Sequence, residues 1–207
     1  MEILEKMFGG AGRVKIMRLF LYNPTSIYSK DDVSDRARVS IKNVLGELSH
    51  FEKMELIKRK SFYKEELKKE KNGTEKVIKI KTFGWELNPD FPYLLPLQSL
   101  LINPDMIKHD SILKKITNAG KIKLLILSGI FIQDPQSRVD LLIVGDRLKR
   151  GTLENILKNI EAEIGKELRY AVFETEDYKY RLSVYDKLLH DILDYPHEKI
   201  LDRIGLK

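Results

Sequence analysis

The sequence predicts an α+β protein of two domains. Helical periodicity runs through the first 55 residues and is followed by two strand-like segments, whereas beyond Gly120 strand-like and helical segments alternate. Four of the seven prolines lie between residues 88 and 104, which indicates a connection there. We therefore expect a first domain over residues 1–88, a helical connector over 89–119, and a second domain with a small mixed sheet over 120–207.

The composition is typical of a globular protein that folds in water. Apolar residues make up 43% of the 207 residues and charged residues 33%, and the sequence contains no cysteine. A disulfide, a thiolate metal site and a cysteine nucleophile are therefore excluded. No apolar run approaches the roughly 20 residues of a membrane span, and the first 30 residues lack the pattern of a secretory signal. We expect a cytoplasmic protein with no membrane partner.

The excess of positive charge is confined to the first half of the chain. Residues 1–88 contain 19 Lys and Arg against 13 Asp and Glu, and residues 89–207 contain 18 against 18. A local basic excess is what a polyanion-binding domain requires, because each cation near a phosphate releases condensed counterions. The alternative is a solvated surface that happens to be basic.

Two short helices are expected before residue 40. Residues 13–22 carry an apolar stripe at helical spacing, which ends before Pro24 because proline disfavours helix in the residue that precedes it. Ser29 is a suitable N-cap for a second helix over residues 30–38.

A third helix is expected to begin after Ser40, which can cap it. Its other face is rich in hydrogen-bonding groups, as in a recognition helix that meets base edges and phosphates in the major groove. The alternative is an ordinary amphipathic helix. The apolar residues that recur at helical spacing and are expected to face a core are Ile41, Val44, Leu45, Leu48 and Phe51.

Two strands are expected next, over residues 56–63 and 76–87, with an Asn72-Gly73 turn between them. Residues 57–81 contain ten basic and four acidic residues. Three helices followed by a basic hairpin is the plan of a winged helix-turn-helix domain, whose hairpin follows the phosphate backbone. The predicted contacts with double-stranded DNA are Ser40, Lys42, Asn43 and Ser49 on the third helix, and Lys58, Arg59, Lys60, Lys68, Lys69 and Lys71 on the hairpin.

The rest of the chain predicts short helices and a small sheet. The connector contains an apolar helical segment and a second helix that ends near Gly120. A mixed sheet covered by helices is the architecture that best buries the apolar residues of these segments. The expected elements are helices over 93–102 and 105–118, strands over 122–127, 139–144 and 168–173, a helix over 153–164, and one closing helix over 178–192.

Part of the second domain resembles a known family. Residues 127–131, Leu-Ser-Gly-Ile-Phe, and 139–146, Val-Asp-Leu-Leu-Ile-Val-Gly-Asp, resemble the core of small nucleotidyltransferase domains of the DNA polymerase beta superfamily. In that family a Gly-Ser turn holds nucleotide phosphates and an Asp-x-Asp on the next strand binds magnesium. The layout over about residues 13–206 is similar to prokaryotic proteins that fuse a winged helix-turn-helix to such a domain.

The chain departs from this family at the residues that carry the chemistry. Gly129 stands at the family glycine, but Ile130 replaces the serine and has no hydroxyl for a phosphate. Arg138 replaces the first aspartate of the pair, so that only Asp140 remains.

Alternate residues of a strand point the same way, so we expect an ion pair between Arg138 and Asp140 that repels a divalent cation. The further acidic candidates, Glu167 and Glu174, are expected on the surface. One carboxylate seldom suffices for two-metal nucleotidyl transfer. We therefore expect an inactive domain with no catalytic residue, no metal and no cofactor.

These observations leave three functional hypotheses. The first is a DNA-binding transcriptional regulator, expected to be a homodimer because operators are usually read as paired half-sites. Its second domain would serve assembly, ligand sensing or partner binding. The second hypothesis is an active nucleotidyltransferase that modifies a protein, RNA or small molecule through Asp140 and an acidic partner that the sequence does not identify. The third is an antitoxin-like protein whose second domain holds another protein chain.

Overall fold

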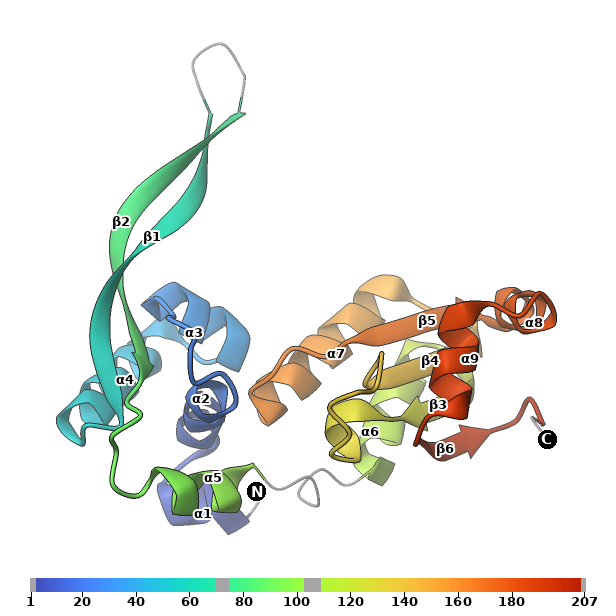
Figure 1. Ribbon diagram of the computed structural model, residues 1–207, viewed down its shortest axis with the longest axis horizontal. Coiled ribbons are helices and arrows are strands. Elements are labelled where there is room, and N and C mark those ends of the chain that lie inside the picture. Colours follow the sequence, from blue (N-terminus) through green and yellow to red (C-terminus); the bar gives the residue numbers. More distant parts are fainter. Residues whose placement is uncertain (1–2, 70–74, 103–108, 206–207) are drawn as a thin grey trace. The chain divides into compact units, whose positions relative to one another are not determined.

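The computed structural model describes residues 3–69, 75–102 and 109–205, except for the side chains of residues 66–69 and 75 (Figure 1). The chain divides into a unit of residues 1–102 with 162–166 and a unit of 103–161 with 167–207. The boundary lies after Ile102, inside the segment that the sequence marks as a connector. Both units combine helices with a sheet, so the predicted α+β class is confirmed.

The first unit begins with α1 (Ile3–Phe8), α2 (Ala11–Tyr22), α3 (Lys30–Ala37) and α4 (Ile41–Lys53). The three predicted helices are present, and α1 is an addition that the sequence does not predict. Ser29 caps α3 as expected. Its Oγ accepts the N–H of Asp32, and the Asp32 carboxylate accepts the N–H of Ser29 in return, at 3.2 and 2.9 Å.

The core-facing side of α4 is narrower than the sequence predicts. Val44, Leu48 and Phe51 are buried, but Ile41 and Leu45 are 44% and 45% exposed. A helix turns about 100° per residue, so Leu48 and Phe51 lie within about 40° of Val44 around the helix axis. By the same geometry, Ile41 and Leu45 lie about 60° and 100° from Val44. The prediction that Ile41 and Leu45 face the core is therefore wrong, because the buried residues of α4 are limited to Val44, Leu48 and Phe51.

A long antiparallel hairpin follows α4. It consists of β1 (Ile57–Lys69) and β2 (Glu75–Leu87), in register from Ile57 opposite Leu87 to Lys69 opposite Glu75. The first strand is longer than predicted, and the predicted Asn72-Gly73 turn lies outside the described residues. Thirteen residues at about 3.3 Å each give the hairpin a length of about 40 Å. It extends well beyond the helices of its unit (Figure 1).

The base of the hairpin is held by the segment between α2 and α3. Tyr28 forms an isolated antiparallel bridge with Trp85, with two backbone hydrogen bonds of 2.9 Å. A Cβ at the neighbouring Gly84 would lie 2.6 Å from the Tyr28 carbonyl oxygen and 2.9 Å from Phe62. The glycine inside β2 is therefore explained by this close approach of a third backbone segment.

The first half of the predicted connector belongs to the first unit. Its helix, α5 (Leu94–Leu101), ends where the guanidinium Nε of Arg18 donates a 3.0 Å hydrogen bond to the carbonyl oxygen of Leu101. Arg18 is only 6% exposed. A cation at the C-terminus of a helix pairs with carbonyl groups that have no partner within the helix. This contact joins α5 to α2.

The second unit contains a four-stranded mixed sheet in the order β5-β4-β3-β6. β4 pairs with β5 in parallel and with β3 antiparallel, and α7 connects the two parallel strands. A parallel pair needs such a crossover. The bounds of the elements are α6 (His109–Ile116), η2 (Thr117–Ala119), β3 (Lys121–Leu127), η3 (Gly129–Phe131), β4 (Leu141–Asp146), α7 (Arg150–Ile164), β5 (Tyr170–Glu174), α8 (Thr175–Ser183), α9 (Lys187–Asp194) and β6 (Glu198–Asp202).

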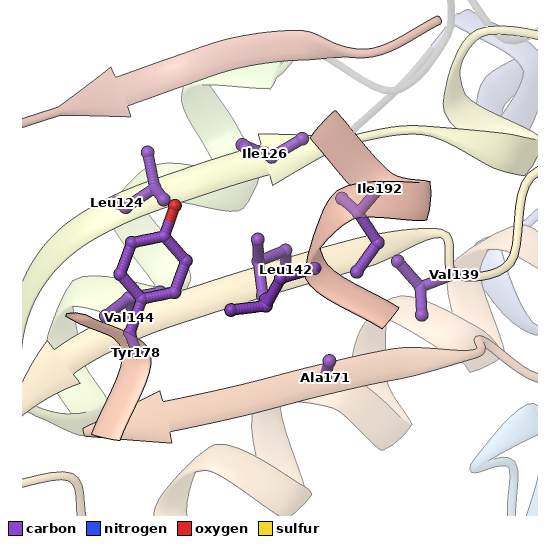
Figure 2. Close-up of a cluster of buried hydrophobic side chains, with 9 residues drawn as sticks. Leu124, Ile126, Val139, Leu142, Val144, Ala171, Tyr178 and Ile192 are labelled. Atoms are coloured by element: carbon purple, nitrogen blue, oxygen red, sulfur yellow. The ribbon is translucent and has the colours of Figure 1, made fainter. Parts of the chain in front are cut away.

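Helices α8 and α9 cover one face of this sheet. Leu124, Leu142 and Ala171 come from adjacent strands and form a buried cluster with Tyr178 of α8 and Ile192 of α9. Figure 2 shows these side chains between the sheet and the two helices. Strand residues alternate between faces, which is why alternate residues in the middle of β3 and β4 belong to this cluster.

The structure corrects the prediction of one closing helix. The chain breaks between α8 and α9 at Tyr185, whose φ is +55° and whose side chain is 80% exposed. Asp186 then caps α9 by accepting the N–H of Leu189. The last strand of the described chain is β6, an edge strand that the sequence does not predict and that pairs with β3.

The described helices are all shorter than a membrane span. The longest of them, α7, has 15 residues, against the roughly 20 that a bilayer requires. None of the helices in the described part of the chain is both long and apolar enough to cross a membrane.

Tyr178 offers a test of the second core. Its side chain is fully buried, and its hydroxyl has no hydrogen-bond partner among the described residues. Burial, with a smaller contribution from the Asp202 carboxylate, raises the pKa of Tyr178 to about 12. Replacing Tyr178 with Phe is therefore expected to keep or raise the free energy of unfolding near neutral pH, by up to about 1 kcal/mol, because a desolvated hydroxyl is removed.

The difference in the free energy of unfolding between the parent and the Tyr178→Phe variant should increase at alkaline pH. An unfolded tyrosine ionises near pH 10, whereas the folded Tyr178 ionises only near pH 12. The parent therefore loses stability as the pH rises through this range, and the Phe variant lacks that loss. Urea unfolding followed by far-UV circular dichroism at pH 8 and pH 11 measures both effects. A variant that is much less stable at pH 8 would contradict them.

Candidate functional site

Helix α4 presents polar side chains on the side away from its core. Lys42, Asn43 and Ser49 are exposed, as the sequence predicts. Lys42 and Ser49 lie within about 20° of each other around the helix and face almost opposite to Val44. Neither Lys42 nor Lys53 has an acidic partner in the part of the chain that is described. Both ammonium groups are therefore available to an external anion.

Ser40 occupies the N-cap position of α4, but its side chain makes no capping hydrogen bond. Its carbonyl oxygen accepts the N–H of Val44 at 2.9 Å, which is the first hydrogen bond of the helix. The expectation that the Ser40 side chain caps α4 is therefore wrong. Ser40 is exposed, and its hydroxyl points to no group of the described chain.

One face of the hairpin combines arginine with aromatic rings. Arg59 lies opposite Trp85 in the register, and its guanidinium lies 5.0 Å from the Phe83 ring centroid and 5.9 Å from that of Trp85. Further along the same face, Tyr63 lies opposite Lys81. Phe83 and Tyr63 are 57% and 67% exposed. This face presents a positive charge and exposed rings together.

Two of the predicted lysines of β1, Lys58 and Lys60, form surface ion pairs. Lys58 lies 3.0 Å from Asp90, and Lys60 lies 2.7 Å from Glu86. Exposed pairs of this kind contribute about 0–1 kcal/mol. A phosphate can therefore replace the carboxylate partner at little cost.

Lys79 and Lys81 of β2 join the face that carries Arg59, although they are not among the predicted contacts. Lys76 and Lys81 have no acidic partner among the described residues, and Lys79 lies 3.5 Å from Glu65. The alternation of Lys79 and Lys81 along β2 is the signal that identifies them, whereas Lys76, opposite Lys68, lies on the other face of the hairpin. Of the remaining predicted contacts, Lys68 and Lys69 belong to β1 but their side chains are not described, and Lys71 lies outside the described residues.

Helix α4 and the hairpin form one surface. The indole N–H of Trp85 donates a 3.2 Å hydrogen bond to the Glu52 carboxylate at the end of α4. Glu52 lies at about the same angle around the helix as Ile41 and Leu45. The exposed side of α4 therefore continues into the hairpin face that carries Trp85 and Arg59.

In the second unit, Asp140 is a buried carboxylate that binds groups of its own chain. It is 4% exposed. Its oxygens accept the backbone N–H of Ile130 at 3.0 Å and that of Arg169 at 2.8 Å. The Arg169 guanidinium adds two longer hydrogen bonds, of 3.2 and 3.4 Å. Both oxygens of the carboxylate are therefore occupied by donors.

The predicted ion pair between Arg138 and Asp140 is wrong. Arg138 instead lies 2.8 Å from Asp191 of α9, and the guanidinium at Asp140 belongs to Arg169. The prediction assumed that residues 138–140 form a strand, but β4 begins only at Leu141. Alternate side chains point to the same face only within a strand. Arg138 and Asp140 lie in the loop before β4, so their side chains point in different directions.

Gly129 and Ile130 enclose the Asp140 carboxylate. Gly129 has a φ of +55°, and a Cβ at this position would overlap Asp140 Oδ1. The preceding Ser128 donates its hydroxyl to the carbonyl oxygen of Val139 at 2.5 Å. The turn that the resemblance assigns to phosphates is therefore packed against a carboxylate.

No three His, Asp or Glu side chains gather as a metal site within residues 3–69, 75–102 and 109–205. Glu167 and Glu174 are both exposed. Glu174 ends β5, whereas Arg169, which binds Asp140, precedes the start of this strand. The two ends of a five-residue strand lie about 16 Å apart. Glu174 is therefore too far from Asp140 to share a metal ion with it.

The chain matches no family model, no curated protein and no solved structure. Its function is therefore inferred from the geometry of these two sites.

Proposed function

We propose that the protein is a DNA-binding transcriptional regulator whose first unit is a winged helix-turn-helix domain. The order of elements supports this: α2, the Tyr28 segment, α3, α4, and then the hairpin of β1 and β2. The observation that carries the proposal is the continuous surface formed by the exposed side of α4, where Lys42 has no acidic partner among the described residues, and the basic, aromatic face of the hairpin.

The dimensions of this surface suit a duplex. An α-helix with its side chains is about 10–12 Å wide and fits the major groove, which is about 12 Å wide. A hairpin of about 40 Å exceeds one turn of B-DNA, about 34 Å, so it can follow the phosphate backbone. In this arrangement Lys42 and Asn43 read base edges, while Arg59, Lys79 and Lys81 bind phosphates.

The second unit is proposed to have no nucleotidyltransferase activity and to serve assembly. Asp140 is engaged by Arg169 and Ile130, which leaves it without a free oxygen for magnesium. Exposed apolar side chains on α8 and after it, Tyr180 and Tyr185 among them, suit contact with another protein surface. We propose that this surface pairs two copies of the chain, so that two α4 helices reach paired half-sites.

The salt dependence of binding tests the proposed function. Affinity of the full chain for a random-sequence duplex, measured by fluorescence anisotropy, is expected to fall about 100-fold between 50 and 200 mM salt, as for about four phosphate contacts. Replacing Lys79 and Lys81 with Ala should weaken all duplexes alike and reduce the salt slope by about 1 for each residue. Replacing Lys42 and Asn43 with Ala should instead reduce discrimination between sequences.

Lys158 provides the control, because it is exposed on α7 in the second unit. Its replacement with Ala should leave both the affinity and the salt slope unchanged. Affinity of the parent that barely changes with salt would refute DNA binding. Transfer of label from a nucleoside triphosphate in the presence of magnesium, lost on replacing Asp140 with Ala, would instead support the nucleotidyltransferase hypothesis.

A further inference from the structure

The exposed side of α4 carries two apolar side chains that the core does not use. Ile41 and Leu45 are 44% and 45% exposed and lie four residues apart, in the first two turns of the helix. Residues at this spacing are neighbours on one side of a helix. They form an apolar stripe beside Lys42, at the end of the helix from which recognition helices contact bases.

Gly46 is a second unusual residue of α4, and it lies about 40° around the helix from Lys42. A Cβ built at Gly46 meets nothing within 4 Å, so no packing within the unit requires a glycine there. Glycine inside a helix is less favourable than alanine by about 1 kcal/mol. A missing side chain in open space allows an external surface to approach the helix backbone closely.

The charges around the stripe favour DNA as the occupant. Lys42 and Lys53 lie on the exposed side of α4 without acidic partners in the described chain, and Arg59 lies on the adjoining hairpin face. These cations attract the phosphates of a polyanion, and the apolar stripe matches apolar groups in the groove of such a polyanion. In the major groove the apolar group on a base edge is the C5 methyl of thymine.

We propose that Ile41 and Leu45 contact thymine methyl groups and thereby set part of the sequence preference of the protein. This inference rests on the proposed function. The Cβ atoms of residues four apart on a helix are about 6 Å apart, and successive bases along a strand are about 3.4 Å apart. The two methyl groups therefore belong to thymines within about two base pairs of each other.

Exchange of thymine for deoxyuridine tests the proposal, because deoxyuridine lacks only the methyl group. A preferred duplex is first selected from a random pool with the full chain, and each thymine is then replaced singly. We expect two positions, within about two base pairs, at which the exchange weakens binding about fourfold, as for loss of contact with one methyl group. Equal affinity for thymine and deoxyuridine at every position would overturn the inference while leaving salt-dependent DNA binding intact.

Variants assign the two contacts to residues. Ile41→Ala and Leu45→Ala should each bind the thymine duplex more weakly and abolish discrimination at one position only. Met54→Ala is the matched control, because Met54 is 42% exposed but follows the end of α4. It should retain discrimination at both positions. Discrimination that survives in both Ile41→Ala and Leu45→Ala would overturn the assignment.

Two further outcomes separate this inference from the function on which it rests. A parent chain without salt-dependent affinity for any duplex would refute the proposed function and the inference together. Normal DNA binding by Ile41→Ala and Leu45→Ala, with loss of self-association in sedimentation equilibrium, would overturn the inference and assign the stripe to a second copy of the chain.

Discussion

Replacing Asp140 with Ala is expected to lower the free energy of unfolding of the second unit by about 3 kcal/mol. The substitution leaves the N–H groups of Ile130 and Arg169 and the Arg169 guanidinium without their acceptor. Buried donors without a partner cost about 1–3 kcal/mol each, and removal of one member of a buried ion pair is similarly destabilising. The loss should be confined to the second unit, because these partners all belong to it.

Hydrogen exchange measured by mass spectrometry can separate the two units. Peptides from β3 and β4 should lose protection in the Asp140→Ala variant, whereas fluorescence of Trp85, the only tryptophan, should report an unchanged first unit. Replacing Glu176 with Ala is the control, because its pair with Lys179 is exposed on both sides and contributes less than about 1 kcal/mol.

The opposite result would have a clear meaning. A carboxylate retained to bind magnesium is often destabilising in the metal-free protein, so its removal raises stability. An Asp140→Ala variant that is more stable than the parent would therefore contradict the structural role of Asp140.

Replacing Gly84 with Ala is expected to destabilise the first unit by about 2 kcal/mol or more. The new methyl group would meet the Tyr28 carbonyl oxygen, the Ile27 side chain and the Phe62 ring, all closer than 3 Å. Overpacking at such a site forces backbone shifts that cost about 1–3 kcal/mol. The shift would also weaken the two hydrogen bonds that join Tyr28 to Trp85.

Thermal unfolding followed by Trp85 fluorescence should show a lower Tm, by roughly 10 °C for a unit of about 100 residues. Because the hairpin would lose its attachment, affinity for DNA should fall as well. Gly46→Ala is the matched control: its Cβ has free space, so it should keep or raise the Tm. Equal Tm values for Gly84→Ala and Gly46→Ala would show that the Tyr28 segment does not restrain β2.

Much of the fold could be predicted because its signals are local. The spacing of Val44, Leu48 and Phe51 predicts the core side of α4, and the Ser29 cap predicts the start of α3. Both depend on hydrogen bonds and packing within a few residues of the chain. The same local pattern fails at Tyr185, where the chain breaks the helical stripe and forms two helices.

The candidate site could be predicted only in part. The exposure of Lys42 and Asn43 follows from helical periodicity, but the exposure of Ile41 and Leu45 depends on how much of α4 the neighbouring helices cover. The partner of Asp140 depends on the path of the loop before β5, which brings Arg169 to it from 29 residues away.

The amino-acid sequence by itself determined the α+β class, the principal helices and strands, and the concentration of positive charge in the first half of the chain. Only the tertiary structure decided that Arg169 binds Asp140, that Tyr28 holds the hairpin at Gly84, and that Ile41 and Leu45 face outward. The physical reason is the range of the interactions: periodicity and capping act over a few residues, whereas ion pairing and burial depend on segments that meet only when the chain has folded.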